Sequence, residues 1–120
     1  MEIRFLGGAR EVGRSAVEVS YKNTRLILDY GVMLNDHPHF PMSVEPRKLN
    51  GILLTHSHLD HSGMVSLLYI SHGPKLYATS MTRHTTAMLV QDFIKLSGYY
   101  LPFEKAEMEA MLRSWREVNY

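Results

Sequence analysis

The chain has 120 residues, of which 45% are hydrophobic and 21% are charged, a composition typical of one globular domain and too apolar for a disordered segment. Thirteen Lys and Arg residues against twelve Asp and Glu residues leave a formal charge of +1, which excludes a global electrostatic attraction to nucleic acid or to an anionic membrane. The absence of cysteine excludes disulfides, thiolate zinc sites, iron–sulfur clusters and a cysteine nucleophile. Any transition metal therefore needs histidine and carboxylate ligands, and the chain has seven histidines.

No targeting or membrane segment is evident in the sequence. The first six residues lack the basic stretch and the long apolar core of a signal peptide. No segment approaches the roughly 18 consecutive apolar residues of a membrane span. We therefore expect a cytoplasmic protein with no membrane partner.

The first third of the chain predicts β structure. Residues 3–6 form a short apolar strand that two glycines end, and a loop follows. Residues 17–21 alternate apolar and polar side chains, which is typical of a half-buried strand, and a tight turn leads into a third strand over 24–29. Residues 32–48 hold three of the five prolines and have no clear periodicity, so we expect a loop there.

The rest of the chain predicts strands that alternate with helices. The apolar run 51–55 is typical of a strand buried on both faces, and a helix is expected from about Ser62 to the Gly-Pro pair at 73–74. A strand over 75–79 and a helix over 82–96 follow. The tail predicts a last helix, because its apolar residues fall at i, i+3, i+4 and i+7, namely Met108, Met111, Leu112 and Trp115. This order indicates one α/β layered fold with a mixed sheet.

The segment 55–63 is the most informative part of the sequence, because it places four side chains that can bind metal within six residues: His56, His58, Asp60 and His61. It follows a buried strand, and the carboxyl ends of strands are where α/β sheets usually place their sites. Side chains two apart on an extended backbone point the same way, so His56 and His58 can converge on one ion. After the chain turns, the other two can face a second ion.

Two ions about 3.5–4 Å apart can activate a water molecule for hydrolysis. Asp60 can ligate one ion and also orient or deprotonate that water. A merely polar, exposed turn is the alternative interpretation, but three histidines and an aspartate directly behind a buried strand make little structural sense without a cation. We therefore predict metal binding.

This segment resembles the His-x-His-x-Asp-His motif of the metallo-β-lactamase superfamily. Residues 7–15 (GGAREVGRS), 28–31 (LDYG) and 79–83 (TSMTR) are similar to its β-CASP branch of RNA and DNA nucleases, which includes ribonuclease J and the cleavage-and-polyadenylation nucleases. The resemblance covers nearly the whole chain, and its tail is the weakest part. It implies the N-terminal portion of an αββα sandwich with a mixed sheet.

The resemblance also assigns roles to individual residues. It makes His56 and His58 ligands of one zinc ion and Asp60 and His61 ligands of the other, with Asp60 as the catalytic residue. Asp29, which could otherwise simply end a strand, becomes a supporting carboxylate outside the ligand set. Other divalent metals remain alternatives to zinc.

The sequence departs from the family pattern in two ways. Ala16 and Tyr30 stand where cysteine is frequent, and Asn50-Gly51 stands where an aspartate is frequent, but none of these positions is a ligand. The later ligand motifs and the β-CASP insertion are absent, since only His72, His84 and Asp92 follow the motif. We therefore expect residues 1–120 to be the N-terminal part of an incomplete metallo-β-lactamase domain.

Three functional hypotheses follow. The first is a metal-dependent RNA nuclease, which in its complete form hydrolyses phosphodiester bonds of single-stranded RNA with a water activated by two zinc ions. In this hypothesis the present chain alone is inactive. The second is a thioester or lactone hydrolase of the same superfamily. The third is a non-catalytic fragment that associates through an uncovered face of its sheet, with homo-oligomers as one outcome.

The remaining polar candidates have less specific signals. His37-Pro38-His39 can form a small metal site, but exposed histidines in a proline-rich loop are the preferred interpretation. His72 is expected at a helix C-terminus and His84 in the first turn of a helix.

Three arginines, Arg10, Arg14 and Arg25, are open candidates for phosphate contacts. The glycines at 7, 8 and 13 lack the G-x-G-x-x-G spacing of a nucleotide-binding loop, and a strand rather than a helix follows them, so we do not expect a phosphate cradle.

Overall fold

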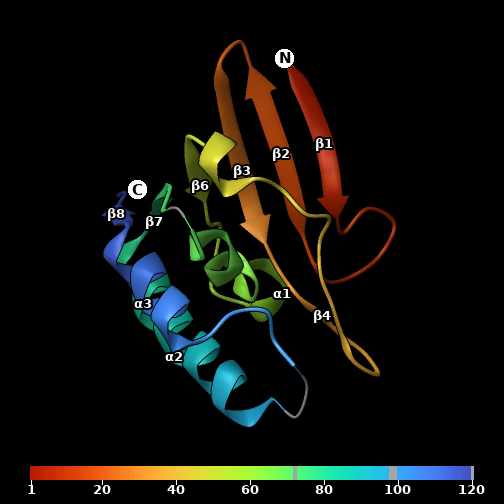
Figure 1. Cartoon of the computed structure of the whole chain (residues 1–120), viewed down its shortest axis with the longest axis vertical. Coiled ribbons are helices and arrows are strands. Elements are labelled where there is room, and N and C mark those ends of the chain that lie inside the picture. The colour runs from red at the N-terminus through yellow and green to blue at the C-terminus, as the bar shows by residue number, and fades with distance from the viewer. Residues whose placement is uncertain (72, 98–99, 120) are drawn as a thin grey trace.

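The computed structural model describes residues 1–71, 73–97 and 100–119 of the chain (Figure 1). The strands, in chain order, are β1 (Glu2–Gly7), β2 (Ala16–Tyr21), β3 (Thr24–Tyr30), β4 (Met33–Leu34), β5 (Pro38–His39), β6 (Gly51–Leu53), β7 (Lys75–Ala78) and β8 (Trp115–Glu117). The helices are η1 (Pro46–Lys48), α1 (Leu59–Ser62), η2 (Val65–Tyr69), α2 (Ser80–Leu96) and α3 (Lys105–Arg113), where η marks a 3-10 helix.

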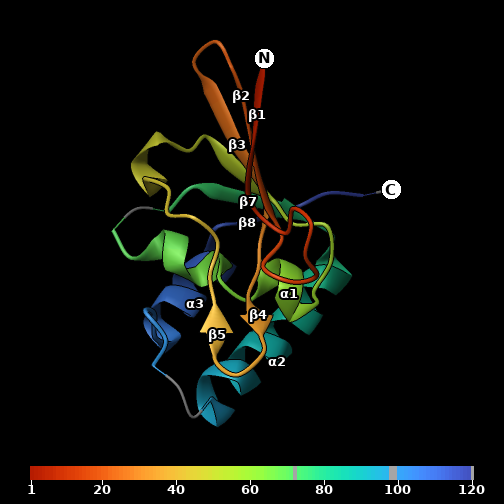
Figure 2. The same ribbon diagram turned by 90° about the vertical axis from the view of Figure 1, so that its right-hand side faces the viewer.

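Six of the strands form one mixed sheet in the order β1-β2-β3-β6-β7-β8. Strands β1, β2 and β3 pair antiparallel, and the hairpin of β2 with β3 is the one that the alternation and the turn at 22–23 predict. Strands β3, β6, β7 and β8 pair parallel. Helices α2 and α3 lie side by side, and the upper ends of β1–β3 extend beyond them (Figures 1 and 2). The expected α/β architecture with a mixed sheet is confirmed.

The two faces of the sheet differ in burial. The register aligns one row of apolar side chains that are 0–8% exposed and belong to the core: Ile27, Ile52, Leu76 and Trp115. A second row, on the opposite face, contains no buried residue: Phe5, Val17, Leu28, Leu53 and Tyr77. Because Leu53 in β6 is 37% exposed, the expectation that the strand after Asn50 is buried on both faces is wrong.

The helices that follow the motif differ from the predicted one. A single helix from Ser62 was expected, but α1 begins earlier, at Leu59, and η2 begins only at Val65. The chain breaks between them because the backbone N–H of Met64 donates to the carbonyl oxygen of Tyr30, 2.9 Å away, which ties this point to the end of β3. Two residues of the motif therefore lie on a short helix. The prediction for His72 falls outside the described residues.

The tail helix is shorter than its periodicity suggests. Helix α3 ends at Arg113, where the Ser114 hydroxyl donates to the carbonyl oxygen of Ala110, and Trp115 begins the edge strand β8. The Trp115 ring is buried and its indole N–H donates to the carbonyl oxygen of Ala78 at 3.3 Å. The apolar spacing was read correctly as core, but the helical assignment of Trp115 is wrong.

Two other local predictions need correction. The segment expected as a loop over 32–48 contains a small hairpin, β4 with β5, and the helix η1. Helix α2 begins at Ser80 rather than at residue 82, because the Thr79 hydroxyl caps it by accepting from the backbone N–H of Thr82. His84 is consequently the fifth residue of α2, in its second turn and not its first.

Candidate metal centre

Backbone contacts with β3 and the first loop hold the motif segment in place. The carbonyl oxygen of Asp60 accepts from the backbone N–H of Ser15 at 2.8 Å, and that of Leu59 accepts from Val32 at 2.9 Å. Gly31 lies so close to this segment that a Cβ atom there would overlap the carbonyl oxygen of Asp60. The sequence therefore needs glycine at this position for close approach of two backbones.

Asp29 ends the regular part of β3 and is 4% exposed. Its φ is +59°, a left-handed conformation that aspartate adopts more readily than most residues. One carboxylate oxygen accepts from the backbone N–H of Thr55 at 2.8 Å, and the other accepts from the Thr55 hydroxyl at 2.8 Å. The second oxygen also lies 2.8 Å from Nδ1 of His61. A buried carboxylate thus joins β3 to both ends of the motif.

This network determines which imidazole nitrogens are free. Because the Thr55 hydroxyl donates to Asp29, its oxygen accepts from Nδ1–H of His56, 2.8 Å away. Nδ1–H of His61 donates to Asp29 in the same way. Both rings therefore keep Nε2 with a free lone pair, the arrangement that supporting carboxylates give to metal-binding histidines.

The predicted ligands lie together at the end of β6. Single donor atoms of His56, His58 and Asp60 all lie within 4.8 Å of one another. Nε2 of His61 is 3.7 Å from Oδ2 of Asp60, and the His61 ring centroid is 4.1 Å from that of His56. Asp60 therefore lies close to the histidine pair at 56 and 58 and also to His61. Imidazole and carboxylate donors at these separations suit Zn²⁺ and similar divalent ions.

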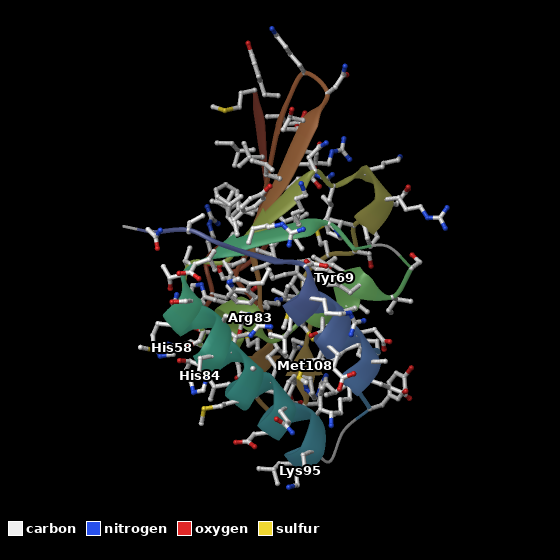
Figure 3. The ribbon with its side chains drawn as sticks, turned by 90° about the vertical axis from the view of Figure 1, so that its left-hand side faces the viewer. His58, Tyr69, Arg83, His84, Lys95 and Met108 are labelled. Atoms are coloured by element: carbon white, nitrogen blue, oxygen red, sulfur yellow. The ribbon has the colours of Figure 1, made fainter. Side chains whose placement is uncertain are left out.

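The cluster is accessible from solvent. The side chains of Asp60 and His61 are 40% and 27% exposed, and His58 is exposed at the edge of the view in Figure 3. A metal held here can consequently meet water and a substrate. Thr55, which connects Asp29 to His56 through its hydroxyl, is not among the residues that the sequence predicted for the site.

The candidate phosphate-binding arginines have other contacts. Arg14 makes a bidentate pair with Glu11, its Nε 2.7 Å from Oε1, and this hydrogen bond lowers the pKa of Glu11 and raises the pKa of Arg14. Arg25 lies 3.9 Å from the buried carboxylate of Glu18. Arg10 is exposed in the first loop. Two of the three arginines thus have a structural partner, which weakens their case as phosphate ligands.

The histidines outside the motif lie elsewhere on the surface. His84 is exposed on α2, where Figure 3 labels it. His37 and His39 lie at the β4–β5 hairpin together with Asp36, a carboxylate that the sequence reading did not include. In the described part of the chain, every helix is too short or too polar to cross a membrane.

Comparison with known proteins gives a consistent result. A family model described as the Metallo-beta-lactamase superfamily matches residues 11–110. The chain is 40% identical over 121 residues to RNase aCSPSF2 of Saccharolobus solfataricus, with 98% of this chain and 25% of that protein covered. It is 35% identical over 133 residues to transcription termination factor FttA of Lokiarchaeum sp., with 99% of this chain and 21% of that protein covered.

Solved structures agree with this result at the level of the fold. A metallo-beta-lactamase from Cronobacter sakazakii matches with a TM-score of 0.54 and 16% identity, covering 73% of this chain and 35% of that chain. The chain spans about a quarter or less of the length of the two curated relatives.

Proposed function

Because the chain belongs to the metallo-β-lactamase superfamily, we propose that it is the N-terminal part of a β-CASP RNA nuclease that uses two divalent metal ions, zinc in the first place. The observation that supports this most is the hydrogen-bond network from Asp29 through Thr55, which leaves Nε2 of both His56 and His61 free beside Asp60. The names of the curated relatives, an RNase and a transcription termination factor, support RNA as the substrate.

Each residue of the centre has a distinct role in this proposal. His56 and His58 hold one ion, and Asp60 and His61 hold the other. When bound, the two ions lower the pKa of water and stabilise the charge that develops on the phosphate. Asp60 orients the attacking water and accepts its proton. Asp29 keeps His61 in the required tautomer and orientation and, through Thr55, does the same for His56.

The incompleteness of the site is part of the proposal. Residues 1–120 supply one group of ligands, and the rest of the domain supplies the remaining ones and covers the open face of the sheet. The chain spans only about a quarter of its curated relatives, and the row from Phe5 to Tyr77 is uncovered. Alone, this chain is then inactive, binds metal weakly and associates through the open face. In the cell we place the complete protein in the cytoplasm, bound to single-stranded RNA.

Cleavage of a labelled single-stranded RNA by the full-length protein that carries this segment tests the proposal. Asp60→Asn is the test variant and Asp92→Asn, an exposed aspartate on α2, is the matched control. We expect Asp60→Asn to reduce cleavage by about 10²–10⁴-fold, the contribution typical of a positioned general base, and Asp92→Asn to leave it unchanged. Equal cleavage by Asp60→Asn and the unmodified protein would contradict the mechanism.

The open sheet face gives a second test that is independent of catalysis. Ile3, Phe5 and Leu53 are 52%, 63% and 37% exposed on this face. We expect the 120-residue chain to self-associate in sedimentation equilibrium and Phe5→Lys to shift it toward the monomer, whereas Met88→Lys, on the exposed side of α2, has no such effect. A wild-type chain that is monomeric at high concentration would show that this face does not mediate self-association.

A further inference from the structure

The β4–β5 hairpin brings together a second group of metal-binding side chains. Asp36 and His37 lie in its turn and His39 lies in β5, and one donor atom of each lies within 4.8 Å of the others. None of the three belongs to the His56–His61 motif. The sequence analysis did not include Asp36 as a candidate.

The distances within this group match a metal coordination shell. Oδ1 of Asp36 lies 3.1 Å from Nδ1 of His37 and 3.3 Å from Nε2 of His39. A tetrahedral ion with bonds of about 2.0–2.1 Å requires neighbouring donors about 3.3–3.4 Å apart. The two imidazole rings lie side by side, with centroids 4.2 Å apart. Two edges of the tetrahedron are thus already close to the required length.

The backbone favours this convergence. His37 lies in the bend directly before β5, and His39 is the second residue of that strand. In this arrangement the two rings lie next to each other. Pro38 between them has a fixed φ, which reduces the conformational entropy lost when the rings are held together. Pairing of Met33 with His39 and of Leu34 with Pro38 closes the hairpin behind the group.

We propose that Asp36, His37 and His39 form a second metal site that takes a divalent transition ion, Cu²⁺, Ni²⁺ or Zn²⁺, through two imidazoles and one carboxylate. Among these ions Cu²⁺ binds tightest, as the general order of divalent affinities requires. Water completes the coordination, since the side chains of Asp36 and His37 are 77% and 55% exposed.

An ion here would fasten the hairpin turn. The hairpin forms a wall of a hollow that Gly13, Leu34 and Asn35 line together with Leu59 and Asp60. Met33 also packs on Gly13, where an added Cβ atom would lie 2.7 Å from its side chain. Occupancy of the hairpin site therefore stiffens a segment that borders the first metal centre without contributing a ligand to it.

Copper titration of the tag-free 120-residue chain tests the proposal. The background variant His56→Ala/His58→Ala removes the first centre, and His37→Ala/His39→Ala is added to it. The control adds His84→Ala, an exposed histidine on α2. We expect the background chain to bind one Cu²⁺ with an electron paramagnetic resonance spectrum that shows two nitrogen ligands. Loss of His37 and His39 should weaken binding by at least about tenfold, the loss that removal of a mere supporting group already causes. His84→Ala should have no effect.

Unchanged copper affinity after loss of His37 and His39, or an equal loss with His84→Ala, would overturn the proposal. If circular dichroism shows that the background variant is unfolded, the same two changes are made in the wild-type chain. There the hairpin variant should lower the Cu²⁺ stoichiometry by one ion and the control should not. Equal Cu²⁺ stoichiometry in the hairpin variant and the His84→Ala control would overturn the proposal. Its outcome is independent of RNA cleavage, so failure here leaves the proposed nuclease function untouched.

Discussion

Asp29→Asn is the substitution that best separates the supporting network from the rest of the fold. Asparagine has nearly the same shape and adopts the left-handed conformation at least as readily, so the φ of +59° costs nothing extra. The change affects only the acceptors. Asp29 now accepts three hydrogen bonds, two from Thr55 and one from His61. An amide has one oxygen, so its NH₂ group must face at least one of these donors.

The magnitude follows from this count. In the better orientation, the amide oxygen keeps the Thr55 hydroxyl and His61, and the NH₂ group faces the backbone N–H of Thr55. The hydrogen bond from the Thr55 backbone to the charged carboxylate is lost, which costs about 1.5–3 kcal/mol. The other two hydrogen bonds remain but now have a neutral acceptor, which weakens each of them by about 1 kcal/mol. We therefore expect Asp29→Asn to lower the free energy of unfolding by about 3–5 kcal/mol. Metal affinity should fall by about 10–100-fold, because His61 is no longer held by a carboxylate.

Urea denaturation and zinc titration of the 120-residue chain measure the two effects. Thr55→Ser keeps the hydroxyl and the backbone N–H, and we expect it to stay within about 1 kcal/mol of the wild type. Asp92→Asn controls for the loss of one negative charge on an exposed position. If Asp29→Asn unfolds within about 0.5 kcal/mol of the wild type and binds zinc equally well, the carboxylate does not support the centre and the reasoning is wrong.

Three further predictions concern the fold around the site. Gly31→Ala should destabilise the chain by about 1–3 kcal/mol, since its Cβ overlaps a backbone carbonyl, whereas Gly73→Ala, with its nearest atom 3.4 Å away, should change the melting temperature little. Met111→Ala should cost about 2–5 kcal/mol in urea denaturation because that side chain is fully buried, and Met88→Ala, 57% exposed, should stay within about 0.5 kcal/mol. Burial raises the pKa of Tyr30 from 10.0 to about 12, so between these pH values only the unfolded chain ionises and stability falls as pH rises. The free energy of unfolding of the wild type should fall by up to about 1.4 kcal/mol per pH unit above pH 10 from this residue, and Tyr30→Phe should lack that contribution. Denaturation at pH 9, 10 and 11 measures the difference.

Sequence periodicity was sufficient for the elements whose signal is local. The first hairpin, β7 and most of α2 follow from alternation, turn residues and the apolar stripe of the helix. It failed where tertiary contacts decide the outcome. The spacing of Trp115 from Met111 fits a helix, yet pairing with β7 places that residue on an edge strand. Leu53 lies in an apolar run, but only one face of β6 is covered by helices, and that difference cannot be read from the run itself.

The candidate metal ligands could be picked out from the sequence because their spacing is short-range, whereas the network that orients them could not. Asp29 and Thr55 are 26 residues apart, and they meet only because β3 and β6 pair in parallel. Nothing in the motif indicates that the Thr55 hydroxyl donates to the Asp29 carboxylate and accepts from His56. Asp36, in contrast, is close in sequence to His37 and His39. It was not predicted because a short polar turn has no repeating pattern that would identify a site.

The unequal support of the three histidines bears on how tightly the proposed centre can bind metal. Hydrogen bonds within the protein fix the rings of His56 and His61 before any ion arrives, so little rotamer entropy is lost there on binding. Within the described residues, the His58 ring contacts the His56 ring but makes no side-chain hydrogen bond, and His58 is exposed. Binding of an ion by His58 therefore costs the rotamer entropy of that side chain. That cost falls on the ion that His56 and His58 are proposed to share, so additional ligands would strengthen binding most at that position.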